Sequence, residues 1–157
     1  MAYDSAGPVV FAGVSAVTAT RGSKDPEVGA RKTVGDEEYI YVYNTGADAQ
    51  ISPGQGAVLS AVTGYSVTVS SISADFLAGV CKHATITTGA YGWLCVKGFT
   101  SVEMGANYSA TAGDPLTLST DGTFDVVSNA TGSNLRAVGK AMEAIASGAS
   151  GQAFICI

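Results

Sequence analysis

The sequence predicts an all-β protein: a small β-barrel or β-sandwich of about eight strands, preceded by an extended N-terminal arm. Two features of the composition and one of the pattern predict it. Twenty of the 157 residues are glycine, and 46% are hydrophobic while only 13% are charged. From residue 36 onward, short apolar runs alternate with turn-forming residues. Disordered chains carry more charge and fewer β-branched residues, so this composition indicates a turn-dense β-protein.

Residues 1–35 are expected to form the arm, and residues 36–157 the β-domain. The first segment is interrupted by Gly7-Pro8 and Asp25-Pro26 and shows no sustained hydrophobic period. It carries a net charge of +1, whereas the rest of the chain carries −6. We therefore expect the arm to contact an acidic surface, with a solvated tail as the alternative. The candidate contact residues are its apolar run and its basic groups: Pro8, Val9, Val10, Phe11, Arg21, Lys24, Arg31 and Lys32.

The β-domain begins with a strand that is apolar or aromatic on both faces. Tyr39, Tyr41 and Tyr43 fall on one face, and Ile40 and Val42 on the other. Such a strand is expected to be covered on both sides. Two further strands are predicted in this part, at residues 57–59 and, from strict alternation, at 66–70.

The strongest local signal is a hairpin at Asp121-Gly122. This pair supplies the positive φ angles that a tight β-turn requires. Leu116 and Leu118 precede the turn, while Phe124 and Val126 follow it, so that these four side chains share one buried face. Further strands are predicted at residues 79–83, 91–98 and 152–157.

Residues 135–146 fit either a helix or a strand. Leu135, Val138, Met142 and Ile145 have helical spacing. A strand is predicted instead, because Gly139 interrupts the segment and the Gly/Ser-rich turn at residues 147–151 follows so soon.

Three cysteines lie inside strand-like runs, and none forms a C-x-x-C pair. Cys81, Cys95 and Cys156 are expected to be small buried hydrophobes in a reducing compartment. The alternative is a metal site. Cys81 and His83 would share a strand face, and Cys95 on a neighbouring strand would be a third ligand, but no fourth ligand is visible.

No pattern of a reaction centre is found, so we expect no enzyme activity, no metal and no cofactor. The nucleophile-elbow pattern lacks its second glycine at both candidate positions, residues 13–17 and 64–68. His83 is the one histidine, and a small hydrolase using it as a base is the weakest alternative. The net charge of −5 and the pI near 4.6 argue against a nucleic-acid partner. No apolar run approaches a membrane span, and no signal peptide is visible.

The order of motifs in residues 34–157 resembles a known family. A strand with the sequence VGDEEYIYVYN is followed by GAYGWLCVKG at residues 89–98, GDPL at 113–116, VGKAMEA at 138–144 and a terminal strand. This order resembles the capsid decoration proteins of tailed bacteriophages, also called head-stabilising or cement proteins. Residues 1–33 take no part in the resemblance.

The resemblance implies a non-enzymatic virion protein that is made in the cytoplasm of the host bacterium. It implies a β-barrel or β-sandwich subunit, often a homotrimer, that binds the major capsid protein on the outside of the head and stabilises it. Low charge and strand-rich edges also favour a homotrimer. The alternative is a carbohydrate- or receptor-binding module of a phage tail or fibre, with Tyr65, Tyr91 or Trp93 as exposed aromatic residues.

Overall fold

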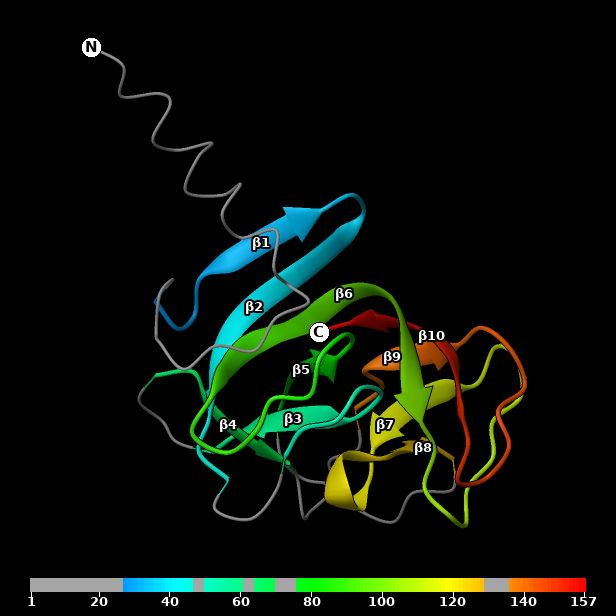
Figure 1. Cartoon of the computed structure of the whole chain (residues 1–157). Coiled ribbons are helices and arrows are strands. Elements are labelled where there is room, and N and C mark those ends of the chain that lie inside the picture. The colour runs from blue at the N-terminus through cyan, green and yellow to red at the C-terminus, as the bar shows by residue number, and fades with distance from the viewer. Residues whose placement is uncertain (1–26, 47–49, 61–63, 70–75, 129–135) are drawn as a thin grey trace.

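The computed structural model of the chain describes residues 27–46, 50–60, 64–69, 76–128 and 136–157. Within these residues it is all-β and contains no α-helix, which confirms the predicted fold class (Figure 1). The strands number ten rather than about eight. They are β1 (Arg31–Val34), β2 (Glu37–Asn44), β3 (Gly56–Leu59), β4 (Ser66–Val69), β5 (Leu77–Cys81), β6 (Tyr91–Glu103), β7 (Pro115–Leu118), β8 (Phe124–Val126), β9 (Gly139–Ala141) and β10 (Ser150–Cys156).

Five strands close into a ring. The order β2-β4-β3-β5-β6 is completed by direct pairing of β2 with β6, so that each of these strands has a neighbour on both sides. Only the β2–β4 pair is parallel. Closure removes the exposed edges that an open sheet of this size would present.

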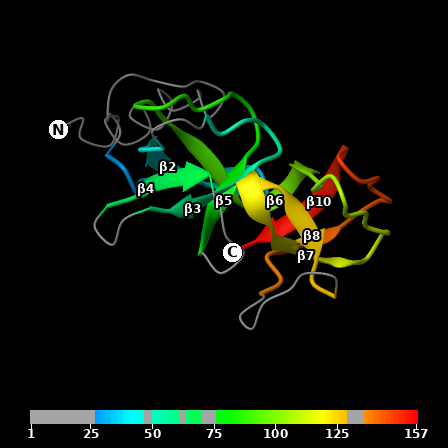
Figure 2. The ribbon, with the colours of Figure 1, turned by 90° about the horizontal axis from the view of Figure 1, so that it is seen from below.

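A second ring uses the other half of β6. Here the order is β6-β10-β9-β7-β8, and a bridge between Met104 and Phe124 brings the chain just after β6 back to β8. The amide of Gly105 donates to the carbonyl of Phe124 at 2.9 Å in support of this closure. β6 is 13 residues long because it serves both rings. Figure 2 shows the two groups of strands side by side.

Each ring has its own core, and the two cores meet at β3 and β5. Successive side chains of these strands point in opposite directions. Ala57 and Cys81 therefore enter the core of the first ring, while Val58 and Val80 pack in the core of the second. The largest fully buried side chains of the second core are Phe124, Met104, Leu116 and Ile155.

The strand β2 is covered on both faces, as predicted. Ile40 and Val42 lie in the first core, while Tyr39 and Tyr41 lie with Trp93 and Cys95 in an outer cluster. Val28 and Ala30 pack against that cluster. Their segment is fixed by two hydrogen bonds: the Gly29 amide donates to the Tyr41 carbonyl at 2.7 Å, and the Tyr41 amide donates to the Ala30 carbonyl at 2.9 Å.

The beginning of the sheet differs from the expected boundary at residue 35. Residues 1–26 of the expected arm lie outside the described residues. The following segment contains β1, which pairs with β2 from Arg31 opposite Ile40 to Val34 opposite Glu37. Because β1 is mostly exposed and carries two adjacent basic residues, it shows no apolar alternation that would predict a strand.

The hairpin prediction is confirmed in its pairing and burial. β7 and β8 are antiparallel, Asp121 and Gly122 have φ angles of 57° and 74°, and the four apolar side chains are buried. The connection is longer than two residues, since it includes the 3-10 turn Thr120–Gly122. The predicted strand in residues 135–146 is observed as β9, only three residues long.

Candidate partner-binding surface

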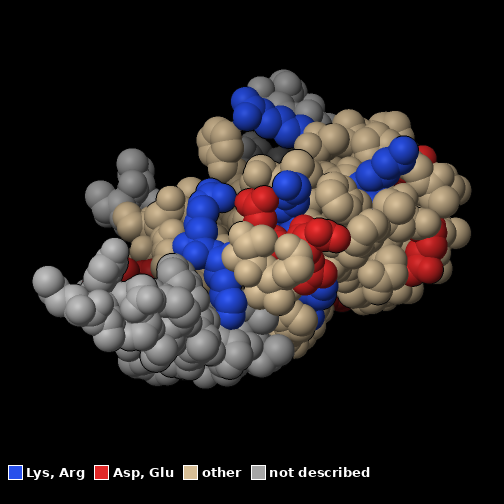
Figure 3. All heavy atoms as spheres, turned by 90° about the horizontal axis from the view of Figure 1, so that it is seen from above, with Lys and Arg blue, Asp and Glu red and all other residues tan. Residues whose placement is uncertain are grey.

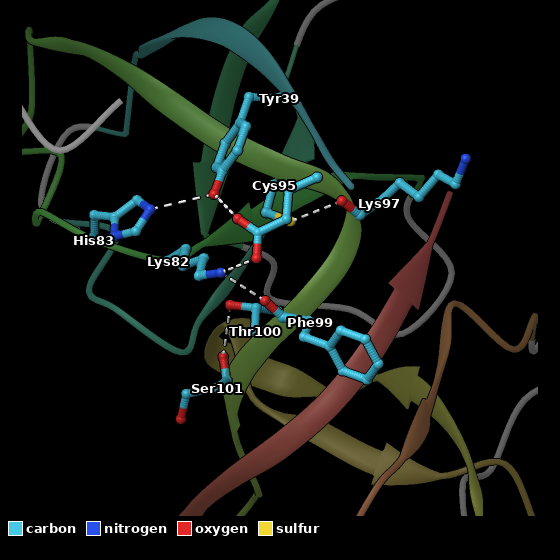
Figure 4. A network of polar contacts seen from close by, with 9 residues as sticks. Tyr39, Lys82, His83, Cys95, Lys97, Phe99, Thr100 and Ser101 are labelled. Atoms are coloured by element: carbon cyan, nitrogen blue, oxygen red, sulfur yellow. Dashed lines mark hydrogen bonds and ion pairs between the residues drawn. The ribbon is translucent and has the colours of Figure 1, made fainter. Parts of the chain in front are cut away.

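A polar network connects β2, the loop after β5 and β6 (Figure 4). The Lys82 ammonium forms an ion pair with the Glu37 carboxylate and donates to the carbonyl of Phe99 at 2.7 Å. The Tyr39 hydroxyl donates to the second carboxylate oxygen of Glu37. The Nε2 atom of His83 lies 3.2 Å from the same hydroxyl. Glu37 and Tyr39 lie on β2, Lys82 and His83 follow β5, and Phe99 lies on β6, so all of them are carried by strands of the first ring or the loop after β5.

The network favours a charged Glu37 beside a neutral tyrosine and a neutral histidine. Burial raises the pKa of Glu37, but hydrogen bonds from Lys82 and Tyr39 outweigh it, and the net shift is downward. Burial, followed by the Glu37 carboxylate, raises the pKa of Tyr39. Burial and then the Lys82 charge lower the pKa of His83. The hydrogen bonds from Lys82 and Tyr39 therefore favour the charged form of the Glu37 carboxylate and hold these side chains in one arrangement.

Gly98 lets β6 pass close to this network. Its φ is +127°, and a β-carbon at this position would lie 2.8 Å from Cγ of Glu37. The pairing of β2 with β6 shifts register at the same place, between Glu38 and Tyr39. Only glycine combines this backbone conformation with so close an approach.

Beyond Gly98, two phenylalanines lie together on the outer side of β6 and β10. Phe99 and Phe154 are directly opposite each other, with ring centroids 5.2 Å apart in an edge-to-face arrangement. Phe99 is 51% exposed. We call the outward positions of β6, β10 and β9 the β6–β10 face; it comprises Lys97, Phe99, Ser101, Glu103, Ser150, Gln152, Phe154, Cys156 and Lys140.

Charges of both signs lie next to one another around this face. Lys97 pairs with Glu38 on the neighbouring β2, with 3.1 Å between Nζ and Oε1. Figure 3 shows acidic and basic side chains intermingled across the middle of the surface seen from above. The pair is largely exposed, so it affects the local charge pattern more than stability.

Most of the candidate contact residues predicted from sequence cannot be placed on this surface. Pro8, Val9, Val10, Phe11, Arg21 and Lys24 lie outside the described residues. Arg31 and Lys32 lie on β1, opposite Ile40 and Tyr39. Arg31 is exposed, and partial burial lowers the pKa of Lys32.

The three-ligand metal site considered from the sequence is not formed. Cys81 is buried in the first core and Cys95 in the outer tyrosine cluster, on different sides of the sheet. Within the described parts of the chain, no group of three His, Cys, Asp or Glu side chains is placed to hold a metal. The expectation that all cysteines are buried is wrong for Cys156, because this residue occupies an outward position at the end of β10.

The expected exposure of aromatic residues is also corrected for one of them. Trp93 is only 6% exposed, since its side of β6 belongs to the cluster covered by Val28 and Ala30. Tyr91 is half-buried and stacks on Tyr41 with centroids 6.0 Å apart. Tyr65 is 38% exposed.

Sequence reasoning missed Phe99 and Phe154. A signal was present, because each phenylalanine stands among polar residues at alternate positions of its strand: Lys97 and Ser101 flank the first, and Gln152 and Cys156 flank the second. The two phenylalanine rings together form a small apolar patch at otherwise polar, outward positions of β6 and β10. The strand β6 was predicted to end at Gly98, which hid the pattern.

Together, these observations define an all-β protein with two adjoining rings of strands that share β6 and an aromatic pair on the outer side of β6 and β10. No protein-family model and no curated protein matches the chain. Its fold is similar to the crystal structure of the N base of head fibre gp8.5 of bacteriophage phi29, with a TM-score of 0.50 and 16% sequence identity. The match covers 74% of this chain and 92% of that one. At this identity the likeness shows a shared fold.

No helix in the described residues is long and apolar enough to cross a membrane.

Proposed function

We propose that this chain is a structural protein of a bacteriophage virion, and that it decorates the outer surface of the head. In this role it binds the major capsid protein and stabilises the shell without catalysing a reaction. The observation that carries the proposal is the likeness of its fold to the base of a phage head fibre across 74% of the chain. The order of motifs in residues 34–157 supports the same role independently of the structure.

The proposed active form is a homotrimer, either before or upon docking, with synthesis in the cytoplasm of the host bacterium. An assembly of three copies attaches through several weak contacts at once, which raises the overall affinity well above that of one contact. Arg31 on β1, with the basic residues that precede it in sequence, is proposed to meet an acidic part of the capsid surface.

The second candidate is a carbohydrate- or receptor-binding module of a phage fibre. The fibre-base fold and the exposed ring of Tyr65 favour it. Such a module would be present in few copies per particle and would bind a glycan or a receptor in isolation.

Phage heads assembled without this chain provide the test. The purified protein is mixed with these heads, and the pellet after sedimentation is analysed by quantitative mass spectrometry. We expect saturable binding with many copies per head and a higher temperature of DNA release. A protein that fails to sediment with heads, or that is found in only a few copies on tails, would refute the decoration role. Saturable glycan binding in that case would support the second candidate.

A further inference from the structure

We infer that the two rings are two copies of one five-strand module, and that the end of β10 is a site for the first strand of a further module of this kind. The inference goes beyond the proposed function, because it holds whichever partner the protein binds. The strand β6 belongs to both copies, since its second half begins the second module as β2 begins the first. In chain order, β2, β3, β4, β5 and the first half of β6 correspond to the second half of β6, β7, β8, β9 and β10.

The strand pairings of the two rings correspond one to one. Around the first ring the order is β2-β4-β3-β5-β6, with β2 paired back to β6. Replacing each strand by its counterpart gives β6-β8-β7-β9-β10, with β6 paired back to β10, which is the order of the second ring. The orientations agree too. In each ring the contact between the first and third strands of the module is parallel, and the other four pairings are antiparallel.

The register agrees at the fourth strand of the module. In each ring, one residue of this strand lies opposite a residue of the second strand and a residue of the fifth. These three are Gly56, Val80 and Cys95 in the first ring, and Pro115, Lys140 and Phe154 in the second. Ring closure does not by itself impose a common register, which is set by the side-chain pattern and the turns. The agreement therefore indicates a duplicated unit.

The register also agrees at the third strand. One residue of this strand lies opposite the second strand and beside the end of the first. These three are Leu59, Val67 and Asn44 in the first ring, and Leu118, Phe124 and Met104 in the second. The pairing of the first with the fifth strand differs by one residue: Gly98 pairs regularly with Ile155, whereas the first ring has a β-bulge between Glu38 and Tyr39.

The turns before the second and fifth strands are repeated as well. They are residues 52–55 and 87–90 in the first ring, and 111–114 and 146–149 in the second. In each turn the amide of the fourth residue donates to the carbonyl of the first at 3.0 or 3.1 Å, and the third residue is a glycine with φ between 67° and 102°. The residues just before the turns form isolated bridges, Ile51 with Ile86 and Ala110 with Ile145. Both strands of the second bridge follow the first by 59 positions (110 − 51 and 145 − 86).

One tight packing contact is repeated in the same place. A β-carbon at Gly92 would lie 2.6 Å from Cδ1 of Ile86, and one at Gly151 would lie 2.6 Å from Cγ1 of Ile145. Both isoleucines are buried, and both glycines are the second residue of their strand. Each ring thus packs its isoleucine directly on the backbone of a glycine, a detail that the strand order does not require.

The correspondence assigns a role to the end of β10. Cys156 is the counterpart of Lys97, because Lys97 lies opposite Glu38 in the first ring and Cys156 lies opposite Lys97 in the second. At Lys97 the chain passes from the first module into the second without a linker. A strand that continues β10 beyond Cys156 would pass from the second module into a third in the same way, and Cys156 is exposed.

The test extends the full-length protein by one module. Residues 98–157 are added a second time directly after Cys156, so that the junction repeats the step from Lys97 to Gly98. A control chain receives residues 105–157 at the same point and therefore lacks the first strand of the added module. Because the two copies yield identical peptides, hydrogen exchange with mass spectrometry shows an unfolded copy as a second, fast population.

We expect one slowly exchanging population for the peptides of β7 and β10 in the extended protein, and two populations in the control. Two populations in the extended protein, one of them exchanging at the rate of an unfolded chain, would overturn the inference. Neither chain is tested for binding to heads, so failure of this inference leaves the decoration role untouched.

A second measurement uses the natural chain and does not depend on the extended protein. Gly92→Ala and Gly151→Ala should each lower the melting temperature through the clash with the isoleucine of the same ring. Ile86→Ala should therefore reduce the effect of Gly92→Ala but not that of Gly151→Ala, and Ile145→Ala should do the reverse. Coupling in one ring only would contradict the equivalence of the two rings.

Discussion

Lys82 and Glu37 form an ion pair across 45 positions of sequence and thereby tie the loop after β5 to the start of β2. The two side chains are only 22% and 24% exposed. The same ammonium also donates a hydrogen bond to the Phe99 carbonyl. The ion pair is therefore connected to a residue of the β6–β10 face. Its removal is expected to affect both stability and the position of that face.

Replacing Lys82 by Met should lower the free energy of unfolding by roughly 1–3 kcal/mol at pH 7, because a partly buried carboxylate loses its charged partner. Lys97→Met removes the exposed pair with Glu38 and is the matched control, with an expected loss of about 0–1 kcal/mol. Urea unfolding followed by fluorescence measures both. Equal losses in the two variants would contradict the importance assigned to the buried pair.

The effect of Lys82→Met should also depend on pH. The pKa of Glu37 is lower in the folded protein than in the unfolded chain, so its contribution to stability is present above the unfolded pKa. That contribution is lost as the pH falls through the folded pKa. The difference in unfolding free energy between wild type and variant should therefore shrink between pH 7 and pH 3. A constant difference over this range would be evidence against the ion pair as its source.

Gly29→Ala should destabilise the protein more than Gly35→Ala. Both glycines have positive φ, so alanine is strained at either position by about 1–2 kcal/mol. At Gly35 the added methyl group meets nothing within 4 Å, whereas at Gly29 it would lie 2.2 Å from the Tyr65 ring. We expect a further loss of roughly 1–3 kcal/mol at Gly29. Adding Tyr65→Ala should remove this excess; if it does not, the ring is not its cause.

Only one of the three cysteines should react in the folded protein. Burial raises the pKa of Cys81 to about 12 and that of Cys95 to about 11, which suppresses their thiolates. Cys156 is exposed. Treatment with a monofunctional maleimide should add one label to the native chain and three to the unfolded chain, as counted by intact mass. Cys156→Ser should take no label when native; rapid labelling of that variant would mean that a buried thiol is accessible.

Asp125→Asn should stabilise the protein at neutral pH. Asp125 is 1% exposed, and burial raises the pKa of its carboxyl, although the carboxylate accepts a hydrogen bond from the Val126 amide at 2.6 Å. A raised folded pKa means that ionisation opposes folding above that pKa, and the penalty disappears as the pH falls below the unfolded value. The stabilisation by asparagine should therefore vanish near pH 3. Thermal melts over this pH range give the answer, and a destabilised variant at pH 7 would contradict it.

The arm is best tested by two deletions with different ends. Removing residues 2–26 should leave the melting temperature unchanged and weaken binding to phage heads, most clearly at low salt where charge attraction is strongest. Removing residues 2–30 should also destabilise the fold, because it uncovers the side chains beneath Val28 and Ala30. Unchanged affinity of the shorter deletion at every salt concentration would show that the arm does not contact the head.

The sequence was informative where structure is local. The hairpin between β7 and β8 was predictable because its turn residues and its four apolar side chains lie within eleven positions. The two faces of β2 were likewise visible in their alternation. Two other pairings join segments that are distant in sequence: the bridge from Met104 to Phe124 and the pairing of β2 with β6. No short sequence pattern predicts them.

The candidate surface was harder to predict from the sequence for the same reason. Phe99 and Phe154 become neighbours only through the register of β6 with β10, which depends on the fold as a whole. β1 was missed because its exposed, basic residues resemble a tail, and its pairing with β2 is the evidence that it belongs to the sheet.

Both rings share β6, so we expect their unfolding to be coupled. Its first half pairs with β2 and β5 and its second half with β10, so loss of β6 would remove strand pairing from both rings. Amide hydrogen exchange along β6 should accordingly proceed only through global unfolding, with both halves equally protected. With such coupling, the two rings should unfold in one cooperative transition, and neither ring should unfold before the other.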